Sequence, residues 1–192
     1  EGRPPGQPLE LLRAPVFRTT PIRIAAGDSL AWFERAGAAR YELTFARDED
    51  GDEPVAEITT DESRLTLPDG LLEADDYHAI LRGVDAAGLP GFASTVRIGA
   101  VDTDAAVAPV DVTITPDGAE YVVEVIDPPE GAAGFEIQVG TDPALEDPLS
   151  IDVAAIGRAV IRLESDVLYA RARTLIDPRT VGTFGATAST GD

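Results

Sequence analysis

Hydrophobic and polar residues alternate along much of the chain in short runs with a period of two. The pattern is clearest in YELTF at 41–45 and in FEIQV at 135–139. A period of two is typical of a strand with one face in a core and the other toward solvent. Such runs recur about every 8 to 12 residues with Gly, Pro and Asp between them, which is typical of a β-sandwich or barrel.

The chain contains two copies of one unit. At an offset of 94 residues, GAARYELTFARD at 37–48 aligns with GAAGFEIQVGTD at 131–142, and APV at 14–16 aligns with APV at 108–110. Similarity at one fixed offset identifies tandem repeats. We predict seven strands in the first copy, near 13–18, 28–34, 40–47, 54–59, 63–67, 76–84 and 92–99. In the second copy we predict them near 109–115, 119–126, 134–140, 148–152, 158–163, 167–175 and 182–188.

The first copy carries motifs that resemble a fibronectin type III domain. Trp32 ends an early strand, GAARYELTFARD follows, and YHAILRGVDAAGLPG at 77–91 gives a strand that begins with Tyr and enters a Gly-containing turn. YARARTLIDPRTVG at 169–182 is the equivalent stretch of the second copy. More narrowly, the pattern is similar to the tandem domains that follow the FecR domain in bacterial envelope proteins, some of which carry a LysM peptidoglycan-binding domain.

The resemblance implies an all-β chain of two tandem fibronectin type III-like (immunoglobulin-like) β-sandwiches, each of about seven antiparallel strands. We expect the first sandwich over 1–103, with 1–8 as a flexible tail, and the second over 104–192. The resemblance also implies a non-enzymatic interaction and spacer module in the periplasm or cell envelope of a bacterium. Its expected partner is a protein or a cell-wall glycan.

Composition narrows the partners and the chemistry. The net charge is −20, from 35 acidic residues against 15 basic ones, all of them Arg. Nucleic acids and anionic membranes bind clustered positive charge, so neither is expected as a partner. No run reaches the roughly 20 apolar residues of a membrane span. The chain has no Cys, which excludes disulfides and thiolate metal sites. Because it begins with Glu1 and contains no Met, we expect it to be part of a longer polypeptide.

Periodicity assigns faces to the two Tyr-containing strands, since successive side chains point to opposite sides. The expected inward residues are Tyr77, Ala79, Leu81 and Gly83 in the first copy, and Leu168, Ala170, Ala172 and Thr174 in the second. The expected outward residues are His78, Ile80, Arg82 and Val84, and Tyr169, Arg171, Arg173 and Leu175. We also expect Glu42 to face Arg82 across neighbouring strands, and Glu136 to face Arg171 or Arg173.

The outward row of Tyr169, Arg171 and Arg173 is the candidate interaction surface, together with Arg82 and His78. Aromatic and Arg side chains are enriched at interface hot spots. The plainer alternative is a salt-bridged sheet face. His78 is the only His in the chain, so it cannot form a His-based metal site, and its position favours an ordinary surface residue.

Asp48, Asp50 and Asp52, within RDEDGDEP, have the spacing of the first ligands of a calcium loop. A complete EF-hand loop would place Gly after the third acid and a Glu further on, whereas here Gly51 precedes Asp52. Asp and Gly are also typical of a solvated hairpin turn, which the pattern favours. Calcium is therefore the one cofactor to test, and we otherwise expect none.

Two other functions remain open. A carbohydrate-binding accessory module of a secreted or surface protein would line up aromatic side chains on one exposed face, whereas the position of Trp32 predicts a core residue. A glycan-cleaving enzyme would need two carboxylates inside a cleft. The adjacent acids at 75–76 and 146–147 are the candidates for such a pair, but small sandwiches rarely provide the cleft, so we predict a chain that is not an enzyme.

Overall fold

A computed structural model describes residues 11–19, 23–145, 148–162 and 164–190. The predicted flexible tail, residues 1–8, lies outside the described residues. All seventeen regular elements found in the described residues are β-strands. No helix in this part of the chain is long and apolar enough to cross a bilayer.

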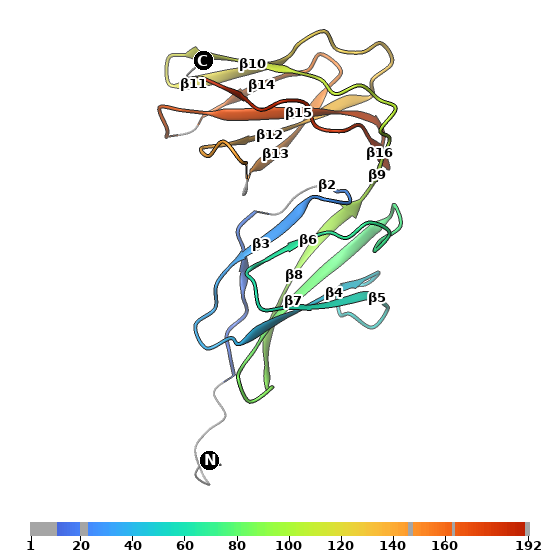
Figure 1. The fold of residues 1–192 in the computed structure, drawn as a ribbon, viewed down its shortest axis with the longest axis vertical. Helices are drawn as coiled ribbons and strands as arrows, with labels where there is room; N and C mark the ends of the chain where they lie inside the picture. Colours follow the sequence, from blue (N-terminus) through green and yellow to red (C-terminus); the bar gives the residue numbers. More distant parts are fainter. Residues whose placement is uncertain (1–10, 20–22, 146–147, 163, 191–192) are drawn as a thin grey trace. The chain divides into compact units, whose positions relative to one another are not determined.

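The first repeat forms two sheets (Figure 1). One has the order β1-β3-β6, from β1 (Val16–Phe17), β3 (Ser29–Phe33) and β6 (Arg64–Thr66). The other has the order β2-β8-β7-β4-β5, from β2 (Arg23–Ile24), β8 (Pro90–Ala100), β7 (Asp76–Val84), β4 (Arg40–Ala46) and β5 (Pro54–Thr60).

The second repeat has the same arrangement. One sheet has the order β10-β11-β14, from β10 (Val112–Asp117), β11 (Glu120–Val125) and β14 (Arg158–Ile161). The other has the order β13-β12-β15-β16-β9, from β13 (Leu149–Ala154), β12 (Gly134–Gly140), β15 (Tyr169–Asp177), β16 (Thr180–Val181) and β9 (Asp102–Thr103), and β17 (Ala188–Ser189) also pairs with β15.

Both repeats therefore pair the first, second and fifth predicted strands in one sheet, and the fourth, third, sixth and seventh in the other. This confirms the all-β fold of two fibronectin type III-like sandwiches. Two short strands, β2 and β9, were not predicted. They pair in parallel with β8 and β16, and two residues are too few to show a period in the sequence.

The last strand of the second repeat differs from the prediction. Strand β16 ends at Val181, before the run expected over 182–188 begins, and only the last residue of that run lies in a strand, β17. The amide of Gly182 donates to Thr174 O, and the amide of Gly185 donates to Ala172 O, at 2.8 and 2.9 Å. Between these two hydrogen bonds the chain advances three residues, from Gly182 to Gly185, while β15 advances two, from Thr174 to Ala172. One extra residue therefore interrupts the ladder.

The chain groups into two compact units that are not consecutive halves of the sequence. Unit 1 comprises Glu1–Arg18, Ala31–Leu65 and Tyr77–Arg97, and unit 2 comprises Thr19–Leu30, Thr66–Asp76 and Ile98–Asp192. Each unit is made of three separate segments, so the units do not test a single boundary along the chain. The domain boundary expected at 103/104 stays a prediction.

Trp32 lies in the core of unit 1 with 0% of its surface exposed, as predicted. Its ring packs edge-on against Phe17 and Tyr41, with ring centroids 6.4 and 5.4 Å apart. In unit 2 the core is aliphatic apart from Phe135, and it gathers the inward side chains of both of its sheets, such as Val123 and Ile137. Burial of these side chains is the main stabilising contribution in both units.

The predicted registers are confirmed. Glu42 lies opposite Arg82, and Glu136 lies opposite Arg173. The expected exposure of Ile80, however, is wrong. Ile80 is outward but only 6% exposed, because the 47–53 loop folds over it: a Cβ at Gly51 would lie 2.9 Å from Ile80 Cδ1. A sheet face open in the sequence pattern is thus partly covered by a loop.

Candidate functional site

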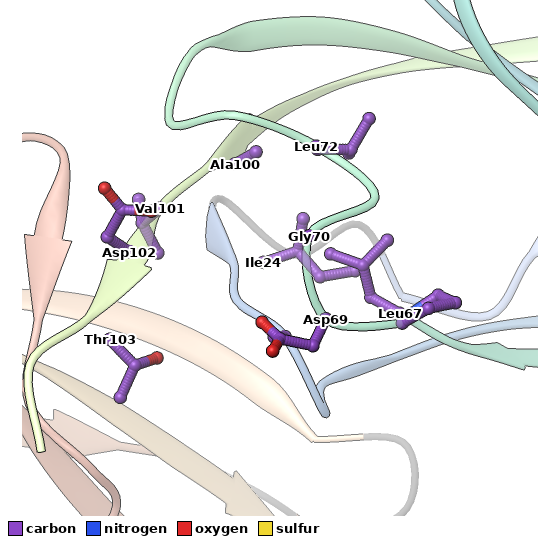
Figure 2. A pocket seen from close by; sticks show the side chains of 11 residues that line it. Ile24, Leu67, Asp69, Gly70, Leu72, Ala100, Val101, Asp102 and Thr103 are labelled. Atoms are coloured by element: carbon purple, nitrogen blue, oxygen red, sulfur yellow. The ribbon is translucent and has the colours of Figure 1, made fainter.

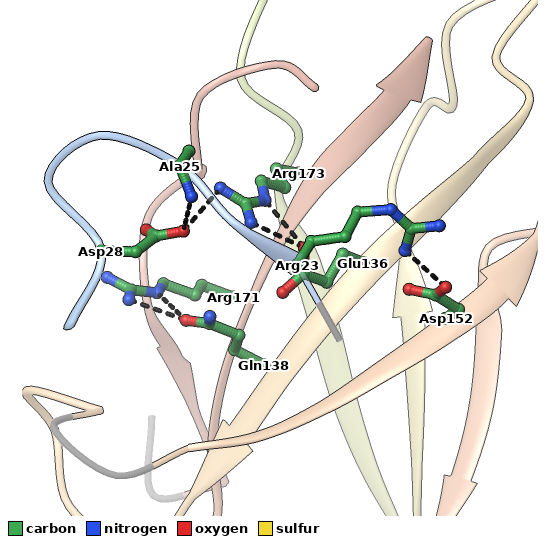
Figure 3. A network of polar contacts seen from close by, with 8 residues as sticks. All are labelled: Arg23, Ala25, Asp28, Glu136, Gln138, Asp152, Arg171 and Arg173. Carbon is green, nitrogen blue, oxygen red and sulfur yellow. Dashed lines mark hydrogen bonds and ion pairs between the residues drawn. The ribbon is translucent and has the colours of Figure 1, made fainter. Parts of the chain in front are cut away.

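The most developed polar arrangement lies on the outward face of β12 and β15 in unit 2 (Figure 3). Arg173 Nε and Nη2 lie 2.9 and 2.8 Å from the same Oε2 of Glu136. The two side chains are 2% and 0% exposed. Burial raises the pKa of the Glu136 carboxyl, and the neighbouring Arg173 guanidinium opposes that rise.

A second carboxylate completes the surroundings of Arg173. Asp28 Oδ2 lies 3.1 Å from Arg173 Nη1 and also accepts a hydrogen bond from the amide of Ala25 at 2.9 Å. The local turn of residues 25–28 therefore orients Asp28 toward the guanidinium. One cation is held between two anions, which balances charge that would otherwise be costly to bury.

Arg171 is held in the same network by neutral groups. Its Nε and Nη2 donate to Gln138 Oε1 at 2.9 and 2.7 Å. The Phe184 ring lies 4.5 Å from the Arg171 guanidinium carbon and 4.4 Å from that of Arg173. These distances are within cation–π range, so the segment after β16 is anchored on both arginines.

These contacts change the picture of the predicted interaction surface. Arg173 is buried, which corrects the expectation that it is exposed. Tyr169 and Arg171 are half-buried rather than fully exposed. The Glu and Gln opposite the arginines in the sequence signalled the polar pairs. Nothing in the local pattern signalled Phe184 or Asp28, because both come from irregular segments.

Arg82 and His78 lie on the outward face of β7, as predicted, with Arg82 exposed and His78 half-buried. In the register Arg82 lies opposite Glu42 and His78 lies opposite Ala46. Glu42 forms an ion pair with Arg40 at 3.2 Å. A role for Arg82 and His78 in partner binding stays a prediction.

The acidic loop before β5 is organised by its own backbone. Asp48 accepts hydrogen bonds from the amides of Glu53 and Asp52 at 2.7 and 3.0 Å. These bonds lower the pKa of the Asp48 carboxyl, the one from Glu53 most. Across the described residues, no group of three or more acidic or His side chains is placed to hold a metal ion. Asp48, Asp50 and Asp52 therefore have the arrangement of a turn, and calcium binding stays a prediction without support from this geometry.

The first carboxylate pair considered for glycan cleavage is engaged in ion pairs. Asp75 and Asp76 lie 3.1 and 3.2 Å from the two terminal nitrogens of Arg179. The second pair, at 146–147, lies outside the described residues. Because both carboxylates contact the same guanidinium, Asp75 and Asp76 do not form the separated acid and nucleophile that glycoside hydrolysis needs.

A pocket of about 330 Å³ lies in unit 2, among Ile24, Leu67, Leu72, Ala100 and Val101 (Figure 2). Its ionisable lining residues are Asp69 and Asp102, and both are exposed. The lining places no His and no basic side chain beside these carboxylates. The pocket therefore shows no catalytic arrangement.

The fold defines the class of this chain as a tandem β-sandwich protein of fibronectin type III-like topology. No family model matches the sequence, and no curated protein matches it. Among solved structures, the chain is similar to the FN1–FN3 domains of chicken CNTN1, with 14% identity, a TM-score of 0.37 and coverage of 92% of this chain and 65% of that one. It is also similar to a segment of two fibronectin type III domains from chicken tenascin, with 13% identity, a TM-score of 0.34 and coverage of 94% and 98%. The chain thus spans just under two thirds of the CNTN1 fragment.

Proposed function

We propose that this chain is a non-enzymatic interaction and spacer module. The observation that carries the proposal is that its polar side chains form ion pairs with one another inside the structure. The arginines and acids best placed for chemistry, such as Arg173, Glu136 and Asp75, are engaged in ion pairs inside the structure. Side chains committed to internal ion pairs stabilise a scaffold, and they are not free to hold or activate a substrate.

The proposed context is the periplasmic side of a bacterial cell envelope, in a protein of the FecR type. Some proteins of that type carry a LysM domain. The support is the resemblance of the two motif-bearing strands and their tandem repetition. A cysteine-free chain of net charge −20 suits a role as a soluble spacer, since its charges repel other copies. The proposed partner is cell-wall glycan or an envelope protein.

The carbohydrate-binding alternative gains no support from the Trp or from the tyrosines. Trp32, Tyr41 and Tyr77 are buried, and Tyr121 and Tyr169 are half-buried. Tyr121 donates its hydroxyl proton to Ser165 O. A flat sugar platform needs exposed rings in a row, and neither the Trp nor the tyrosines provide one.

Co-sedimentation with purified peptidoglycan sacculi, at low and at about 0.15 M salt, tests the wall partner. We expect part of the chain to pellet with sacculi at both salt concentrations, because specific contacts survive the screening of surface charge. The matched variants are Arg82→Ala and Tyr169→Ala, one in each repeat. A chain that stays in the supernatant at both salts would contradict a wall partner. Release of soluble reducing ends from the sacculi would contradict the non-enzymatic assignment.

A further inference from the structure

Strand β5 is an open edge of its sheet. It is the last strand in the order β2-β8-β7-β4-β5, and only β4 pairs with it among the described residues. Figure 1 shows it at the margin of the sheet beside β4. A strand at an edge presents unpaired backbone N–H and C=O groups to whatever approaches.

Other edge strands of the described chain are less suited to pairing. β1, β6 and β14 have two, three and four residues. β10 contains Pro116, which cannot donate a hydrogen bond, and Asp152 of β13 is engaged by Arg23. β5 has seven residues. Its start is blunted by Pro54 and by a bulge at Val55, and the regular ladder runs from Ala56 to Thr60.

The charged residues of the segment 48–62, which contains this edge, all have one sign. Residues 48–62 contain eight acids and no base: Asp48, Glu49, Asp50, Asp52, Glu53, Glu57, Asp61 and Glu62. Glu57 lies in the middle of the strand and is exposed. Pairing with the same edge of a second copy would bring like charges together, which is destabilising. The same field attracts a strand that carries positive charge.

We propose that the edge of β5 binds an extended, Lys- or Arg-rich segment of a partner protein by strand addition. Backbone hydrogen bonds to Ala56–Thr60 would supply affinity, and a basic side chain opposite Glu57 would select the partner. The proposal deepens the interaction role proposed above and names the chemistry of one partner.

The test uses the full chain and an acetylated, amidated seven-residue peptide that alternates Val and Lys. Amide chemical shifts are followed by NMR at about 0.15 M salt. We expect the largest shifts at residues 54–60, while residues 149–154 of β13 serve as an internal control. Absence of binding, or shifts spread over the acidic surface, would overturn the proposal.

Two methylated peptides separate strand addition from simple attraction of charge. One is N-methylated at every Lys and the other at every Val, so both keep their charge. The backbone N–H groups of alternate residues in a strand point to the same side. When the Lys side chains lie on the same face as Glu57, either the Lys N–H groups or the Val N–H groups point at β5, but not both. One methylated peptide should therefore bind like the parent and the other should not. Equal binding by both would overturn strand addition.

Charge selection is tested with Glu57→Lys, and Glu120→Lys on β11 is the matched control with the same change in net charge. Reversing one cross-strand charge should weaken peptide binding by about fivefold, while Glu120→Lys should change it less than twofold. Equal weakening by both variants, or dimerisation of the unliganded chain in sedimentation, would overturn the proposal. The sacculus experiment uses none of these added basic peptides, so its failure would leave this result unaffected.

Discussion

Arg173 and Glu136 lie opposite one another on β15 and β12 and form a buried ion pair, with Arg173 Nη2 2.8 Å from Glu136 Oε2. Both residues belong to an alternating strand pattern that would normally expose them. Their burial makes this part of the outward face belong to the folded interior, while Tyr169 and Arg171 on the same face are half-buried. The free energy of unfolding, and its dependence on pH, should therefore depend on this pair.

Removing one member of the pair should be costly. Arg173→Met or Glu136→Leu should each lower the free energy of unfolding by about 3–5 kcal/mol, because the remaining charge stays buried without its partner. Replacing the two together by Met and Leu should cost far less. Urea unfolding of the single and double variants measures this coupling.

The matched control is the pair of Arg158 and Glu124, which lie 3.1 Å apart with each side chain 53% exposed. Removing it should cost about 0.2–1 kcal/mol at most, because solvent screens an exposed pair. Equal losses for the two pairs would contradict the assignment of Glu136 and Arg173 as a buried pair.

The titration of Glu136 should make stability depend on pH. Burial raises its pKa above the ordinary value of 4.5 in the folded state. The folded chain then binds this proton more readily than the unfolded chain does, so the contribution to stability is present below 4.5 and is lost as pH rises through the folded pKa. Relative to Glu136→Gln, the wild type should lose unfolding free energy across that window and level off above it. Urea unfolding between pH 4 and 8 measures this difference, and a difference of opposite slope would contradict it.

Two glycines 94 residues apart, Gly91 and Gly185, allow the segment that precedes the first long strand of each repeat to pack closely. A Cβ at Gly91 would lie 2.5 Å from the carbonyl oxygen of Leu12, and a Cβ at Gly185 would collide with the carbonyl oxygen of Val110. A backbone carbonyl cannot move aside as a side chain can. Gly91→Ala and Gly185→Ala should therefore each cost about 1–3 kcal/mol or more.

Gly83→Ala is the control for the glycine variants. The three atoms nearest to its added Cβ all belong to side chains, and the nearest is the Cβ of Ala38 at 3.3 Å. The variant should therefore cost less than either clash. Thermal unfolding followed by circular dichroism gives the ranking. A larger loss for Gly83→Ala than for Gly185→Ala would contradict the packing described here.

Asp48 should act as a cap for its loop rather than as a calcium ligand. Its pKa is lowered in the folded state by the amides of Glu53 and Asp52, so its contribution to stability is present above the ordinary pKa and is lost as pH falls through the folded pKa. Asp48→Asn should speed hydrogen exchange at those two amides. Calcium should leave the melting temperature of both proteins unchanged. A calcium-dependent rise in the wild type that is absent in Asp48→Asn would restore the calcium site.

Much of the fold follows from local patterns. Period-two alternation predicted seven strands of the first repeat, β1 and β3 to β8, and six of the seven expected in the second. The repeat offset predicted that both repeats share one topology. The prediction of a continuous strand near 182–188 was wrong. An extra residue between two ladder hydrogen bonds cannot be detected in the alternation of hydrophobic and polar residues. The short strands β2 and β9 were missed for lack of length.

The sequence by itself determined most of the strands, the faces of these strands and the partners across them, including Glu136 opposite Arg173 and Trp32 in a core. These features depend on the spacing of residues along one strand and on the order of neighbouring strands. Both can be predicted from the sequence. Only the tertiary structure decided which outward residues are covered. Asp28 and Phe184 close over the arginines, and the loop at Gly51 closes over Ile80. These covering groups come from irregular segments, whose positions are set by packing at a distance and not by any local period.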